Sequence, residues 1–115
     1  MRADPAELMR PVLHGDVVAA ARALLPLPDC ARAAALRGML ARAAAADAYR
    51  KRFGRAHRAW GNGSLMAVAL PRVRGAEPFL DDAEYCRCLA LVFETLAAWR
   101  AENRGRAALR VRARR

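Results

Sequence analysis

The sequence has little of what secreted or membrane proteins use. Only 3 of its 115 residues are cysteine, and an odd number argues against a framework of disulfide bonds. The first residues, MRADPAEL, contain no apolar run of the kind that a secretion signal requires. No window approaches the roughly 18 apolar residues of a membrane-spanning helix. These absences predict a cytoplasmic protein that does not enter membranes.

Aromatic residues and strand patterns are also scarce. Aromatics make up 6% of the chain, so the expected core is built mainly from Leu, Val, Met and Ala. No alternating strand pattern and no internal repeat is present. Alanine and arginine are abundant instead, and both favour helix, although both also have GC-rich codons. The length suits one domain, and the predicted fold class is all-α, a small single-domain bundle of about four helices.

Periodicity and capping signals place these helices. They are expected at Asp16–Leu25, Asp29–Phe53, Gly63–Pro71, and from Asp81 to Glu102 or Asn103. Asp29 and Asp81 are the expected N-caps, with Glu84 completing a capping box, and Gly54 is the expected residue after the second helix. The DPAE stretch predicts a short N-terminal turn capped by Asp4. Residues 71–80 are expected to form a loop.

The predicted core joins the second and the last helix. Leu36 and Leu40 share a face of the second helix with several alanines. The last helix carries its large residues on one face, namely Tyr85, Cys88, Leu89, Val92, Phe93, Leu96 and Trp99. We therefore expect Leu36, Leu40, Leu89 and Leu96 to pack against one another.

Positive charge is concentrated in two places. The net charge is +10, and residues 104–115 contain six arginines and no acid, so the chain divides into a helical domain at 1–103 and an Arg-rich, disordered tail at 104–115. A second basic cluster occupies residues 50–58. Such clusters are typical of sequence-nonspecific nucleic-acid contact, although a solvated tail that reflects coding bias fits equally. The candidate contact residues are Arg50, Lys51, Arg52, Arg110, Arg112, Arg114 and Arg115.

The stretch HRAWGNGSLM (57–66) admits two interpretations. In the first, Asn62 or Ser64 caps the third helix, the glycines adopt positive φ, and Trp60 closes the end of the core. In the second, the free N–H groups at the helix start bind an anion. The candidate anion-binding residues are Arg55, His57, Asn62, Gly63 and Ser64. No phosphate-binding P-loop is present, because the Gly-Lys-Ser/Thr signature is missing.

Asp47 falls within about 20° of Leu36 around the second helix, in its apolar stripe. A buried carboxylate needs a partner, and the Trp60 indole, the N–H groups near residues 62–64 or His14 could supply one. Alternatively, the stripe has reached solvent there, and Asp47 pairs with Arg50 or Lys51 at helical spacing. In the first case Asp47 and Trp60 form a structural polar contact.

Catalytic and metal chemistry find no support in the sequence. Cys86 and Cys88 point about 200° apart on a helix, so they cannot hold one metal ion. No nucleophile stands at a meaningful spacing from a base. We therefore expect no metal, no cofactor and no enzymatic activity.

Three stretches together resemble a known family. They are MRPVLHGDVVAAARALL (9–25), AHRAWGNGSLM (56–66) and EPFLDDAEYCRCLALV (77–92), and they are similar to small bacterial proteins with a domain of unknown function, over roughly residues 9–100. The resemblance implies no activity or ligand. The expected function is therefore a non-catalytic binding or adaptor role through contacts of helix surfaces with another protein. Nonspecific nucleic-acid association, and an anion or small-ligand site at residues 60–64, are the alternatives.

Overall fold

The computed structural model describes residues 10–113, and every regular element in that range is helical. The elements are α1 (His14–Leu24), α2 (Asp29–Phe53), α3 (Leu65–Ala69), the 3₁₀ helix η1 (Leu70–Arg72) and α4 (Ala83–Ala113). The predicted all-α class with four α-helices is confirmed. The turn predicted at Asp4 lies outside the described residues.

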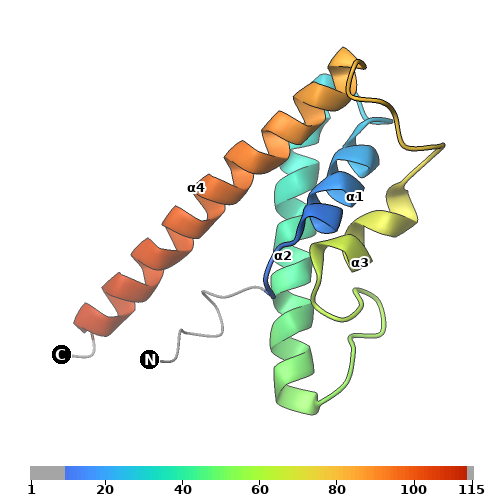
Figure 1. The fold of residues 1–115 in the computed structure, drawn as a ribbon. Helices are drawn as coiled ribbons and strands as arrows, with labels where there is room; N and C mark the ends of the chain where they lie inside the picture. Colours follow the sequence, from blue (N-terminus) through green and yellow to red (C-terminus); the bar gives the residue numbers. More distant parts are fainter. Residues whose placement is uncertain (1–9, 114–115) are drawn as a thin grey trace.

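The two long helices form an open V with α1 and α3 on one side of it (Figure 1). α2 and α4 run in the same general direction, come together at their N-terminal ends and diverge toward their C-terminal ends. α1 runs the opposite way and packs extensively on both α3 and α4. The predicted pairing of α2 with α4 therefore describes only part of the core, because α1 packs at its centre.

α1 begins two residues earlier than predicted, and Asp16 is the reason. Its Oδ2 accepts the N–H of Leu13 at 2.8 Å, so this carboxylate sits inside the first turn rather than before it. Its Oδ1 accepts the N–H of Met66, at the start of α3, at 2.9 Å. Asp16 is only 5% exposed. One buried carboxylate thus joins the beginnings of two helices.

The bounds predicted for α2 are confirmed at both ends. Pro28, rather than Asp29, is the N-cap. Asp29 occupies the first turn, where the helix dipole stabilises a negative charge. Gly54 ends the helix with φ of 69°, and its N–H donates to the carbonyl of Arg50 at 2.8 Å. This is the left-handed conformation expected of a glycine after a helix.

α4 differs from the prediction at both ends. Its cap is Asp82 instead of Asp81, because Asp82 Oδ1 accepts the N–H of Tyr85 at 3.0 Å. The expected end at Glu102 or Asn103 is wrong, since the helix continues to Ala113. Asn103 is buried, so α4 still packs on the domain there, and the alanines and arginines that follow favour helix. The described part of the predicted disordered tail, 104–113, is thus the end of α4.

The core follows the predicted leucines with one correction. Leu36, Leu40 and Leu96 are buried, and Leu89 packs on them partly buried. Phe93, predicted on the same face, is 55% exposed, which makes that prediction wrong. Thr95 is buried instead, so the buried face of α4 is rotated away from Phe93.

Arg32 ties three helices together from a buried position. Its Nε and Nη2 donate to the carbonyls of Leu24 and Leu25 at the end of α1, at 3.1 and 3.2 Å. Its Nη1 donates to Glu84 Oε2 of α4 at 2.8 Å. Glu84, expected to complete a capping box, is therefore the partner of a buried cation, which needs such a partner.

Candidate nucleic-acid interface at the end of α2

The loop after α2 caps α3 with its own side chains. The N–H of Ser64 donates to Asn62 Oδ1 at 3.0 Å, and the N–H of Ala67 donates to Ser64 Oγ at 3.1 Å. The N–H of Met66 is held by Asp16. These bonds confirm the capping interpretation. They also leave these three donors occupied, so an anion at this short helix start would have to displace partners that the chain already supplies.

Asp47 is buried, as the first interpretation predicts, and it is paired with Arg50 and Lys51, as the second predicts. The carboxylate is 1% exposed, and its partners are the neighbouring cations: Oδ1 lies 3.0 Å from Arg50 Nη2 and Oδ2 lies 2.9 Å from Lys51 Nζ. Gly63 packs directly on Asp47, since a Cβ at position 63 would lie 2.7 Å from Asp47 Cα. Asp47 therefore supports the glycine loop by contact, while its charge is satisfied within α2.

A row of four aromatic rings borders this end of α2. The ring centroid of Tyr49 lies 4.6 Å from that of Phe53 and 5.0 Å from that of His57. The His57 and Trp60 rings stack at 4.7 Å with an interplanar angle of 11°. His57 Nδ1 accepts the N–H groups of Ala59 and Trp60 at 3.1 and 3.0 Å, which fixes the ring in place. Phe53, at the outer end of the row, is 53% exposed.

One cation lies over these rings, and two more are close to them in the sequence. The guanidinium carbon of Arg52 lies 5.3 Å from the centroid of the Phe53 ring, within cation–π range. Arg55 and Arg58 follow along the chain and are exposed. We call the rings of Tyr49, Phe53 and His57, together with Arg52, Arg55 and Arg58, the aromatic–basic surface. Its mixture of stacking faces and positive charge fits bases and phosphates.

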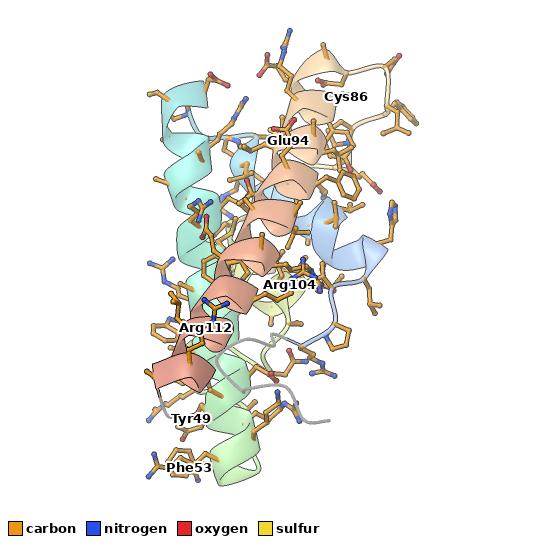
Figure 2. The ribbon with its side chains drawn as sticks, turned by 90° about the vertical axis from the view of Figure 1, so that its left-hand side faces the viewer. Tyr49, Phe53, Cys86, Glu94, Arg104 and Arg112 are labelled. Carbon is orange, nitrogen blue, oxygen red and sulfur yellow. The ribbon has the colours of Figure 1, made fainter. Side chains whose placement is uncertain are left out.

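The other described residues predicted to contact nucleic acid lie in α2 and along α4. Arg50 and Lys51 are paired with Asp47, as described above. Figure 2 shows Arg104 and Arg112 along α4 in the view that also shows Tyr49 and Phe53 at the end of α2. Both arginines are exposed. Arg110 lies in α4, but its side chain, like all of Arg114 and Arg115, falls outside the described part of the structure.

Tyr49 and Phe53 were not among the residues predicted to form a site. They stand four residues apart on a helix, a spacing that places two rings on the same face. Together with the neighbouring arginines this spacing was a usable signal. The role of His57 was harder to foresee, because it depends on the tight turn that brings His57 and Gly61 into mutual backbone hydrogen bonds at 2.8 and 3.0 Å.

Comparison with protein families gives a clear assignment. The model of a domain of unknown function, DUF7742, matches residues 10–96. The chain belongs to this family. The matched range contains α1, α2, α3 and most of the buried part of α4, and it contains the whole aromatic–basic surface. No curated protein and no solved structure matches the chain.

Two features of the described residues bear on alternative functions. Within residues 10–113, no helix is both long and apolar enough to cross a membrane. The same part of the chain brings together no group of three or more His, Cys, Asp or Glu residues that could hold a metal ion.

Proposed function

We propose that this DUF7742 protein is a non-catalytic binding protein that associates with single-stranded nucleic acid without sequence preference. The observation that carries the proposal is the aromatic–basic surface. Its exposed ring, Phe53, offers a face on which a base can stack, and Arg52, Arg55 and Arg58 offer contacts to the phosphates on either side. Every base has a face that can stack on a ring, and every nucleotide carries a phosphate that a cation can contact. Such a surface therefore binds without sequence preference.

The single strand is favoured over the duplex by the rings. In a duplex the bases are stacked on each other, and an aromatic side chain at the protein surface gains nothing from them. In a single strand each base is free to stack on protein, which contributes about 1–3 kcal/mol per base. Arg104 and Arg112 at the far end of α4 would add salt-dependent attraction without distinguishing between the two forms.

Fluorescence anisotropy with a labelled oligo(dT) tests the proposal. Replacing Phe53 by Ala should weaken binding by roughly 5- to 150-fold, the loss of one stacked base. Phe79→Ala is the matched control, because Phe79 is 83% exposed and lies in the loop before α4. Arg55→Ala should lower the slope of log Kd against log salt by about 0.7, the value for one phosphate contact on a single strand.

Three outcomes would count against it. The duplex of the same sequence could bind as tightly as the single strand, which would remove the role of the rings. Phe79→Ala could weaken binding as much as Phe53→Ala does. Deletion of residues 104–115 could abolish binding completely, which would transfer the activity from the aromatic–basic surface to the end of α4.

The second candidate is a protein-binding adaptor role. Phe79 and Leu80, side by side before α4, are 83% and 71% exposed, and adjacent exposed apolar side chains are typical of protein contacts. Affinity purification from the native cell, with and without nuclease, separates the two roles. A partner that is retained after nuclease treatment, and lost from a Phe79→Ser/Leu80→Ser variant, would support the adaptor role. A partner released by nuclease would support the nucleic-acid role.

We place this activity in the cytoplasm and expect a bacterial source. Free cysteines support the compartment: Cys30, Cys86 and Cys88 are all unpaired thiols, the state that a reducing environment maintains. The source follows from the resemblance to small bacterial proteins. Localisation of a tagged chain in its native cell tests the expected compartment.

A further inference from the structure

A cleft of about 340 Å³ opens where the segment before α1 meets α2 and α4. Within the described part of the chain, four cations line it, namely Arg10, Arg50, Lys51 and Arg100, and Asp47 is the one acid that does so. The volume lies at the lower end of the range found for small-molecule sites. The cations come from three separate segments, so the cleft exists only in the folded chain.

The positive charge of this cleft is only partly balanced. Asp47 pairs with Arg50 and Lys51 through its two oxygens. Arg10 donates to a neutral group, the carbonyl of Asn62, at 3.3 Å. Among residues 10–113, no carboxylate lies within ion-pair distance of Arg10 or Arg100. The described lining, four cations and one carboxylate, therefore carries three net positive charges around a concave surface.

Arg50 adds a donor that lacks an acceptor. Its Nε is buried and has no hydrogen-bond partner within the described residues, although its Nη2 is held by Asp47. A buried donor without an acceptor is costly, and a shift of the Arg50 side chain toward an oxygen atom bound in the cleft would satisfy it. The planar guanidinium groups of Arg10, Arg50 and Arg100 match the oxygens of a phosphate, which accept two parallel N–H bonds from one arginine.

We propose that this cleft binds the phosphate group of a small phosphorylated molecule. Pro11 and Val12, which also line it, give the remainder of the ligand an apolar wall. The site is independent of the proposed nucleic-acid function, because neither Arg10 nor Arg100 belongs to the aromatic–basic surface. It also differs from the loop at residues 60–64, whose side-chain oxygens on Asn62 and Ser64 accept N–H groups at the start of α3.

Isothermal titration calorimetry of the full chain with AMP tests this inference, with inorganic phosphate and adenosine as companion ligands at constant ionic strength. AMP and phosphate should bind, and adenosine should not. Arg100→Ala should weaken AMP binding at least about tenfold, the loss of one charge-assisted contact. Arg72→Ala removes the same charge from an exposed position that lies outside both the cleft and the aromatic–basic surface, and it should leave the affinity within about twofold of the original value.

The result that overturns the inference is equally specific. If AMP and phosphate fail to bind at millimolar concentration, or if adenosine binds as well as AMP, no phosphate site exists. If Arg72→Ala weakens AMP binding as much as Arg100→Ala does, general electrostatic attraction explains the binding and the cleft does not. Oligo(dT) with and without a 5′-phosphate is titrated into the native chain and into Arg100→Ala. If Arg100→Ala removes an affinity gain from the 5′-phosphate, the cleft binds a strand end, and if the 5′-phosphate gives no gain, the cleft binds a free small molecule. Failure of oligo(dT) binding alone would leave the AMP result standing.

Discussion

Replacing Gly63 by Ala should destabilise the fold by an amount that the structure allows us to divide into two parts. Gly63 has φ of 96°, in the left-handed region, and a Cβ there would lie 2.7 Å from Asp47 Cα and Cβ and 2.8 Å from Asp47 Oδ1. The first part is a backbone cost of roughly 1–2 kcal/mol. The second part is the overlap with a buried, rigid neighbour, and overpacking of this kind costs about 1–3 kcal/mol.

Gly75 separates the two parts. It also has a positive φ, 74°, but a Cβ there would meet nothing within 4 Å. Gly75→Ala therefore carries the backbone cost alone. Both substitutions also restrict the unfolded chain, which returns about 0.4–1 kcal/mol in each case and cancels in the comparison. Gly63→Ala should consequently be about 1–3 kcal/mol less stable than Gly75→Ala.

Urea unfolding followed by far-ultraviolet circular dichroism measures this difference by linear extrapolation. The slope against urea should be the same in both variants, which shows that the unfolded states are comparable. A difference of less than about 0.5 kcal/mol, near the error of the extrapolation, would contradict the contact between Gly63 and Asp47. The loop would then owe its shape to the hydrogen bonds of Asn62 and Ser64 alone.

Three further predictions concern buried and paired groups. Asp16→Ala leaves the N–H groups of Leu13 and Met66 without their acceptor and should lower the free energy of unfolding by about 2–4 kcal/mol. In the same urea experiment, Asp29→Ala should cost far less, because the Asp29 side chain is 92% exposed. Equal losses of stability would refute the role of Asp16. The hydrogen bond from Arg32 lowers the pKa of Glu84, so its contribution is present above the unfolded pKa and is lost as the pH falls through the folded value. The stability difference between the native chain and Glu84→Gln should therefore shrink below about pH 4, and a constant difference from pH 7 to pH 3 would contradict this. Cys88 is buried, and burial raises the pKa of its thiol. Ellman's reagent should therefore modify exposed Cys30 and Cys86 in the folded chain and Cys88 only after unfolding. Equal modification rates for the three thiols would show that Cys88 is accessible.

Local signals were sufficient for α2 and insufficient for α4. Pro28, Asp29 and Gly54 act on the residues next to them, so the bounds of α2 follow from the chain itself. The end of α4 depends on the competition of Asn103 and Gly105 with the many Ala and Arg residues near them. Burial of Asn103 decides this competition, and burial is a tertiary property that sequence periodicity does not report.

Some features of the candidate site likewise follow from the local sequence, and others depend on tertiary contacts. The basic cluster and the capping of α3 follow from residue type and spacing alone. The partner of Arg32 lies 52 residues away, and no local pattern indicates it. Arg10 and Arg100 join Arg50 and Lys51 only because α2 and α4 diverge and leave a cleft between them. Helical periodicity placed Asp47 in the apolar stripe of α2 but left its burial open, and its direct contact with Gly63 depends on tertiary packing.

The interior of α1 bears on why this chain is so rich in alanine. Ala20 and Ala21 are fully buried, and Ala19 and Ala23 nearly so. Side chains this small let neighbouring helix axes approach to about 8 Å, and a valine or leucine would force them apart. Nucleotide composition can account for alanines on the surface, where many residues would serve. In α1 steric selection would keep them unchanged, even in a genome that drifted toward A and T.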